Sequence, residues 1–177
     1  WLEANKDKIG SMDVRLTIDK DTKSVDAPKA EKNAKPSPNK IQKDEVIYAC
    51  VLKSQVKKEI SDISVSYTIY KRVMTRDKNG SSTNRVETDG TATVKQLAAL
   101  GTATFNTTAV VVEDSFKKGG KGQKDTKRSE TIEGFVVTLS VGGKEFLKQS
   151  HPENFIGRLE EEKKRVEGRE EENGEEN

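Results

Sequence analysis

Alternation of apolar and polar residues is the dominant pattern along this chain. It is clearest over residues 12–19, 63–69 and 135–141, where every second side chain is apolar. A period of two places successive side chains on opposite faces, which is typical of strands with one buried face. Residues 46–54 are apolar at almost every position, which predicts a central strand with both faces covered.

Further extended runs and several turn signals extend this pattern. Residues 91–97, 102–113 and 144–149 are expected as strands, and residues 85–88 as a short, weak one. Asn79-Gly80 and Gly142-Gly143 are typical of tight turns, because these residues adopt positive φ at little cost. Seven or eight short strands separated by such turns predict an all-β fold, an antiparallel β-sandwich.

The alternation also predicts which side chains share the core. We expect the apolar positions of three of these strands to face one core, with the alternate polar positions facing solvent. The residues predicted for this core are Phe105, Tyr67, Ile69, Val137 and Leu139.

The two ends of the chain differ from the body. From Pro152 onward the chain is rich in Glu, Lys and Arg, with one apolar patch at Phe155, Ile156 and Leu159. Because proline suits the first turn of a helix, a C-terminal helix is expected near Pro152, fraying after Val166. The predicted organisation is an N-terminal arm at 1–11, for which a short helix is one option, a sandwich at 12–150, and a charged helix with an acidic tail at 151–177.

Composition excludes several classes of site. The chain has one Cys and one His, too few for a zinc site or a disulfide within one chain. Cys50 lies in an apolar run and is interpreted as a buried, inert thiol. No run approaches the roughly 18 apolar residues of a membrane helix. The Gly-rich run at 119–122 lacks the Lys-Ser/Thr pair and following helix of a phosphate loop, so no cofactor is predicted.

Few residues in the chain are suited to catalysis. Nucleophilic mechanisms need an imidazole base, and His151, expected at the surface between the last strand and the helix, is the only candidate. Asp62, Asp114 and Glu133 flank predicted strands and would need to converge in a cleft to act as hydrolytic carboxylates. A hydrolase therefore stays open as an alternative, and the main expectation is a protein that is not an enzyme.

Charge distribution gives the one hint of a binding site. Residues 158–177 hold nine acidic and five basic residues, which leaves 27 Lys and Arg against 21 Asp and Glu in residues 1–157. Two Lys-rich stretches, 20–45 and 114–129, lack apolar periodicity and are expected as long exposed loops. Clustered lysines bind polyanions by releasing condensed counterions. The candidate polyanion-binding residues are Lys117, Lys118, Lys121, Lys124, Lys127 and Arg128.

Two alternatives for these stretches remain. They are either solvated loops without a ligand or a surface for an acidic polysaccharide. Nucleic acid is not expected as a partner, because Phe116 is the only aromatic residue near the candidate lysines and base stacking would be poor. An unknown protein partner is equally compatible with the sequence, and the oligomeric state is left open.

Two segments carry a family resemblance. Residues 97–107 (LAALGTATFNT) resemble a corner of bacterial immunoglobulin-like and fibronectin-III-like sandwiches, in which Leu-x-x-Leu/Pro-Gly leads into a strand of alternating Thr and Phe. Residues 133–144 (EGFVVTLSVGGK) look like the final hairpin of such domains. The combination is similar to uncharacterised exported sandwich proteins of Verrucomicrobia-type bacteria, although the Cys…Trp…Cys pattern of true immunoglobulin domains is absent.

This resemblance implies an immunoglobulin-like sandwich, a secreted or periplasmic location and no site residues. Together with the missing catalytic groups, it leads us to expect a non-catalytic, exported binding or structural module at the cell envelope. The alternatives are a polyanion-binding protein that uses the basic loop at 117–128 and a hydrolase with unrecognised carboxylates.

Overall fold

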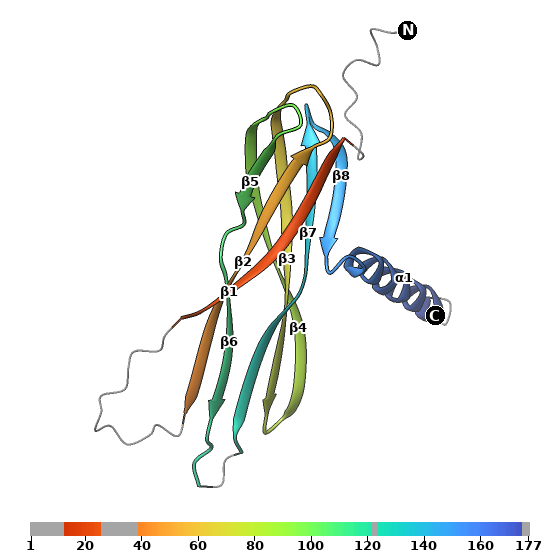
Figure 1. Cartoon of the computed structure of the whole chain (residues 1–177). Helices are drawn as coiled ribbons and strands as arrows, with labels where there is room; N and C mark the ends of the chain where they lie inside the picture. The colour runs from red at the N-terminus through yellow and green to blue at the C-terminus, as the bar shows by residue number, and fades with distance from the viewer. Residues whose placement is uncertain (1–12, 26–38, 122–123, 175–177) are drawn as a thin grey trace, which may run out of the picture.

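The described part of the protein is an all-β structure with one C-terminal helix, as the alternating pattern predicts. The computed structural model describes residues 13–25, 39–121 and 124–174, and side chains only as far as Arg165. The N-terminal arm expected at 1–11 lies outside these residues. In chain order the elements, all labelled in Figure 1, are β1 (Val14–Val25), β2 (Lys40–Ser54), β3 (Ile60–Asp77), β4 (Gly80–Leu97), β5 (Thr102–Asn106), β6 (Val110–Lys117), β7 (Thr126–Val141), β8 (Lys144–His151) and α1 (Phe155–Gly174).

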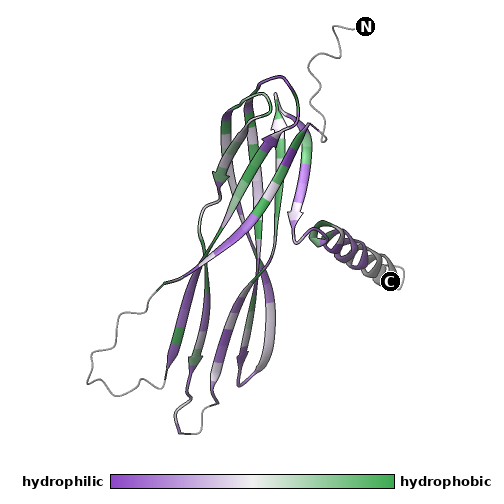
Figure 2. Ribbon diagram, in the orientation of Figure 1, coloured by the Kyte–Doolittle hydropathy of each residue, from purple (hydrophilic) through white to green (hydrophobic). Residues whose placement is uncertain are grey.

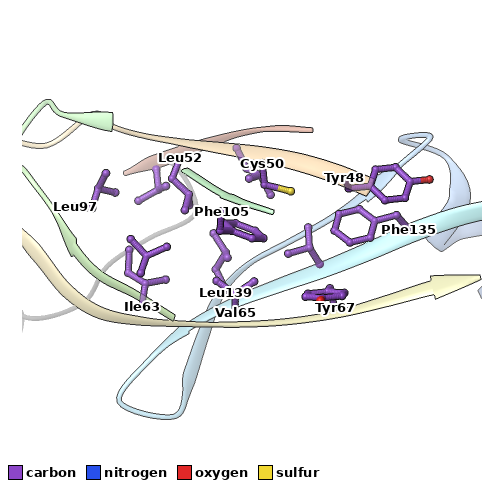
Figure 3. Packing of buried hydrophobic residues seen from close by; sticks show 14 of the residues in the cluster. Tyr48, Cys50, Leu52, Ile63, Val65, Tyr67, Leu97, Phe105, Phe135 and Leu139 are labelled. Carbon is purple, nitrogen blue, oxygen red and sulfur yellow. The ribbon is translucent and has the colours of Figure 1, made fainter. Parts of the chain in front are cut away.

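At one end the antiparallel strands form two facing layers, which we call the sandwich end. One layer has the order β1-β2-β5 and the other β8-β7-β3-β4. Tyr48 of β2 and Phe135 of β7 stack between the layers, with their ring centroids 4.4 Å apart, as Figure 3 shows. The five residues predicted for the core, Phe105, Tyr67, Ile69, Val137 and Leu139, all lie in this buried cluster, which confirms the predicted strand parity.

At the other end the two layers merge into one. β6 pairs with β2 from Val46↔Val110 to Lys40↔Phe116 and with β7 from Asp114↔Ser129 to Lys117↔Thr126. The strand order there is β1-β2-β6-β7-β3-β4. We call the far part of this single layer the tip, defined as residues 40–42, 74–83, 114–121 and 124–129. Figure 2 shows that apolar residues are concentrated at the sandwich end, while the tip is mostly hydrophilic.

The run expected as one strand over 102–113 is divided into β5 and β6. Thr107 is buried at the break, where its backbone N–H donates to the Tyr48 carbonyl and its hydroxyl accepts from the Tyr48 N–H, both at 3.0 Å. The next backbone N–H, of Thr108, donates to the Tyr67 hydroxyl at 2.9 Å. Threonine side chains can replace ladder hydrogen bonds in this way, and alternation alone does not reveal it.

Where the structure describes them, the two Lys-rich stretches begin and end in strands, which corrects the bounds of the long loops expected at 20–45 and 114–129; residues 26–38 and 122–123 lie outside the described residues. β1 continues to Val25 and pairs with β2 from Lys43 onward, while β6 reaches Lys117 and β7 begins at Thr126. These strands are largely exposed, so no buried face produces an alternating sequence. Backbone pairing with neighbouring strands forms them instead.

The predicted turns are confirmed. Gly80 has φ +134°, and Gly142 and Gly143 have φ +58° and +77°, so each adopts the backbone region that favours glycine. The carboxylate of Asp77 accepts a hydrogen bond from the Asn79 N–H at 2.7 Å and fixes the β3–β4 turn. The weak strand expected at 85–88 belongs to β4, a single strand of 18 residues.

The helix α1 docks through its first turn. Phe155 is 1% exposed and lies edge-on to Tyr70, with ring centroids 5.1 Å apart. A Cβ built on Gly134 would lie 2.3 Å from Cδ1 of Phe155, so only glycine leaves room for this ring. Pro152 precedes the helix by three residues instead of opening it. The Ser150 hydroxyl and the Phe155 N–H both donate to the Pro152 carbonyl, and these two bonds hold residues 150–155 in a turn.

An ion-pair bridge fixes the helix further along. Arg85 of β4 bonds Glu133 of β7 through Nε at 2.7 Å and Glu162 of α1 through Nη1 at 2.6 Å. The hydrogen bonds that Arg85 donates to Glu162 and then to Glu133 raise the pKa of Arg85 further above its ordinary value. The same pairing with Arg85 lowers the pKa of Glu162. The guanidinium therefore links β4, β7 and α1.

Candidate functional site: the basic tip

The tip gathers most of the residues predicted to bind a polyanion. Lys117 is the last residue of β6, Lys118, Lys121 and Lys124 lie in the β6–β7 connection, and Lys127 lies on β7. All five are exposed. They lie at the end of the molecule opposite the β7–β8 turn, beside the β3–β4 turn (Figure 1).

Strand register adds basic residues that are distant in sequence. Lys127 pairs with Arg76 of β3 on one side and with Phe116 of β6 on the other, and Phe116 pairs with Lys40 of β2. Directly paired residues of antiparallel strands present their side chains on the same face. Lys40, Phe116, Lys127 and Arg76 thus form one row across the tip. No local sequence signal joins Lys40 and Arg76 to the 117–128 segment, because register alone brings them together.

The charge of the tip is strongly positive. Its four segments contain nine Lys and Arg residues against three Asp. Each carboxylate accepts a local hydrogen bond: Asp77 from the Asn79 N–H, Asp114 from the Ser129 hydroxyl at 2.6 Å, and Asp125 from the Gly119 N–H at 2.9 Å. None of the tip's lysines forms an ion pair with another residue that the structure describes.

Arg128, the sixth predicted residue, is separated from this row. Its register partner is Ser115, so its side chain lies on the opposite face from Lys127. Its Nε donates to Glu130 at 2.8 Å, and Lys71 Nζ donates to the other oxygen of Glu130 at 2.8 Å. The Glu130 side chain is only 4% exposed. Arg128 therefore belongs to an ion cluster around the buried Glu130, between the tip and the sandwich end.

The pKa of Glu130 follows from this cluster. Burial of the carboxylate acts to raise its pKa, but hydrogen bonds from Lys71 and Arg128 outweigh burial and lower it. The Glu113 N–H adds a further hydrogen bond, at 3.2 Å, to the Glu130 oxygen that Lys71 contacts. Glu130 is thus charged at neutral pH and fully engaged, which makes it a structural residue.

A shallow depression of about 260 Å³ lies in the face of the tip. Strands β7, β3 and β4 each contribute two adjacent side chains on the same face, and the backbone between them completes the floor. The six side chains are Lys127 and Ser129, Arg76 and Met74, and Ser81 and Thr83. Two cations and several hydroxyl groups therefore converge on one small surface.

The residues considered for catalysis do not come together. Register places Asp62 beside the Ile63↔Val94 pair at the sandwich end, while Asp114 pairs with Ser129 at the tip. The third carboxylate, Glu133, is held by Arg72 and Arg85 near the helix. Cys50 is buried as predicted, and burial together with Asp19 raises its thiol pKa to about 12.

His151 is less exposed than expected. It is the last residue of β8, is partly buried, and lies edge-on to Tyr48 with ring centroids 5.9 Å apart.

A second hollow of about 450 Å³ lies over β3, β4 and β7 and is lined mainly by hydroxyl groups, with Asp89 as its one charged residue. The basic depression is therefore the stronger candidate for a charged ligand.

Comparisons with known proteins leave the chain without an assigned family. No family model matches it, and no curated protein matches it. One similar solved structure is described as "X-ray structure of Northeast Structural Genomics Consortium target SoR45"; it shares 9% identity, with 79% of this chain and 86% of that chain covered, at a TM-score of 0.27. A likeness at this level carries no argument about function. Among the described residues, no helix is long and apolar enough to span a membrane.

Proposed function

We propose that this protein is a non-catalytic binding module that holds an acidic polysaccharide on its basic tip. One observation carries the proposal: apart from Arg128, which pairs with Glu130, the tip has eight basic residues against three acidic ones, and all three carboxylates already accept local hydrogen bonds. A polymer with regularly spaced anionic groups would neutralise several lysines at once and release their counterions.

The proposal includes an exported setting at the cell envelope and an immunoglobulin-like fold. Strand order supports the fold: the first, second and fifth strands share a layer, as strands A, B and E do in immunoglobulin domains. The last two strands pair beside the third in the opposite layer, as strands G, F and C do. The exported setting rests on the sequence resemblance and would be tested by fractionating cells that express the tagged full-length gene product.

Heparin chromatography tests the binding surface. We expect the full chain to be retained at low salt, and replacement of Lys117, Lys118, Lys121 and Lys124 by Gln to remove most of that retention. The matched control replaces Lys53, Lys95, Lys144 and Lys148 by Gln, which removes the same charge from exposed positions at the sandwich end. Unretained wild type, or equal loss of retention in both variants, would contradict the proposal and leave a structural module with a solvated tip.

The acidic tail offers a second measurement on the same column. Residues 167–177 contain six Glu and one Arg. If this segment occupies the tip in competition with the polysaccharide, a chain ending at Val166 should elute at higher salt than the full chain. Equal elution of the two forms would show that the tail does not compete.

A further inference from the structure

Two cations lie side by side in the depression without a counter-charge. Arg76 and Lys127 are directly paired on adjacent antiparallel strands, where side chains start about 5 Å apart and like charges destabilise the sheet. The side chain of neither residue forms an ion pair or a hydrogen bond with another residue in the described part of the chain. An anion placed between these two groups would relieve their repulsion.

Hydroxyl groups border the same pair. Ser81 is the register partner of Arg76, and Thr83 lies two residues further along β4 on the same face. Their hydroxyls bond to no other side chain or backbone group that the structure describes, so both are available as donors. Ser129 is different, because its hydroxyl donates to the Asp114 carboxylate at 2.6 Å.

We propose that this depression is a subsite for one tetrahedral oxyanion, the sulfate or phosphate ester group of an acidic polysaccharide; this inference rests on the proposed function. The planar guanidinium of Arg76 would bond two oxygens side by side, and Lys127 would add a point charge. Ser81 and Thr83 would donate to a third oxygen, which a planar carboxylate lacks. The exposed rings and chains of Phe116 and Met74 would contact the sugar beside the ester.

Inorganic sulfate is the simplest probe of the subsite. Sodium sulfate is titrated into the isotopically labelled full chain at constant ionic strength, balanced with chloride, while backbone amide shifts are followed by NMR. We expect saturating shifts confined to residues 74–76, 81–83 and 127–129. Arg76→Gln and Lys127→Gln should each raise the dissociation constant about tenfold, the effect of one lost charge-assisted hydrogen bond, and the control Lys118→Gln should leave it unchanged. Linear shifts, or equal effects in all three variants, would overturn the subsite.

Arg76→Lys separates the geometry of the subsite from its charge. This variant keeps the charge, so the salt dependence of heparin binding should be unchanged while affinity for a sulfated tetrasaccharide falls about tenfold. Ser81→Ala removes a donor to the third oxygen, so it should weaken binding of the sulfated tetrasaccharide and leave unchanged the affinity for a polyuronate tetrasaccharide, which carries only planar carboxylates. Equal loss of affinity for both sugars would overturn the preference for a tetrahedral group. The affinity for a polyphosphate of similar length, compared with that for the sulfated tetrasaccharide, shows whether the subsite prefers phosphate or sulfate.

The outcomes also separate this inference from the proposed function. Replacing the four lysines at 117–124 by Gln could abolish heparin binding while Arg76→Gln and Lys127→Gln leave sulfate binding unchanged. In that case the subsite fails and the binding module stands. If heparin does not bind but sulfate saturates at the depression, polysaccharide binding fails and a site for a small oxyanion stands. Unchanged amide shifts outside the tip would show that each variant remains folded.

Discussion

The sandwich end and the tip are built from the same strands and differ in almost everything else. β2, β3, β4 and β7 run through both, but only at the sandwich end does a second layer cover one face of each strand. The largest buried side chains gather there, whereas Met74 and Phe116 at the tip remain 49% and 36% exposed. Stability is therefore concentrated at one end, which leaves the other end free to present charge and side chains to a ligand.

The boundary between the two regions has its own chemistry. Lys71 and Arg128 form an ion cluster around the buried Glu130 where β6 joins β7, and Thr107 and Thr108 lie at the break between β5 and β6. Both features occur where the layers merge, and both include a buried polar side chain, Glu130 in one and Thr107 in the other. Polar side chains with defined partners complete the structure at that point.

The same substitution in the two regions should give the largest contrast. Phe135→Ala should lower the free energy of unfolding by about 3–5 kcal/mol, because its ring is completely buried and stacked on Tyr48. Phe116→Ala at the tip should change it by less than about 1 kcal/mol, as is usual for exposed positions. Urea denaturation of both variants measures the difference. Similar losses would show that the tip contributes to the core.

Removing the charge at the boundary should have the next largest effect. Glu130→Gln leaves Lys71, whose side chain is 16% exposed, without its counter-charge, and loss of one partner of a buried ion pair typically costs about 3–5 kcal/mol. We expect a loss near the lower limit, since the Val111 carbonyl still accepts from Lys71 at 3.2 Å. A loss below about 1 kcal/mol, within the range of exposed pairs, would show that the cluster is solvated.

The pH dependence of this variant gives a second readout. The pKa of Glu130 is lower in the folded state than in the unfolded state, so its contribution is complete above the ordinary Glu pKa. The contribution is lost as pH falls through the folded-state pKa. The stability difference between wild type and Glu130→Gln should therefore shrink steadily in acid, as followed by denaturation at a series of pH values. A constant difference would contradict the lowered pKa.

A glycine substitution tests the helix docking that lies outside both layers. Gly134→Ala should displace Phe155 and lower the free energy of unfolding by about 1.5–3 kcal/mol, the value of burying such a side chain. Gly157→Ala is the control, since nothing lies within 4 Å of a Cβ at that position and alanine favours a helix. Amide exchange in the first turn of α1 should rise in the first variant only. Equal exchange would mean that Phe155 does not hold the helix.

The smallest effect is expected for the ion pair on the helix. Glu162→Gln should lower stability by less than about 1 kcal/mol at neutral pH, because half of its side chain is exposed to solvent. Arg85 lowers the Glu162 pKa, so this difference should also disappear as pH falls below the ordinary Glu range. Amide exchange along the second turn of α1 reports the change. A larger loss would indicate that the bridge from β4 through Arg85 supports the sheet itself.

Sequence reasoning succeeded where burial imposes a pattern. Alternation located β3 and the second half of β7, and predicted that Tyr67, Val137 and Leu139 share a core, because one face of these strands is covered. The Gly142-Gly143 turn was equally visible, since its backbone requires residues that tolerate positive φ. Local chemistry was sufficient for these features.

Reasoning from sequence failed where long-range pairing decides the structure. The end of β1 and the strands of the tip carry lysines and threonines on both faces, so they resemble loops until their partners are known. The same limit applies to the site: five predicted lysines do lie at the tip, but Arg76 joins them only through the β3–β7 register, and Arg128 is diverted to Glu130. Residues paired across strands have no fixed spacing in the chain.

The continuity of the long strands has a mechanical consequence. β3 and β4 each have 18 residues, so the hairpin that they form extends roughly 60 Å from its turn at the tip to the sandwich end. A pull on a ligand held at the tip would load both strands along their length. The ladder hydrogen bonds lie perpendicular to that direction, so many would bear the load together instead of opening one by one. The molecule is thus suited to transmit tension from its tip to its core without unravelling.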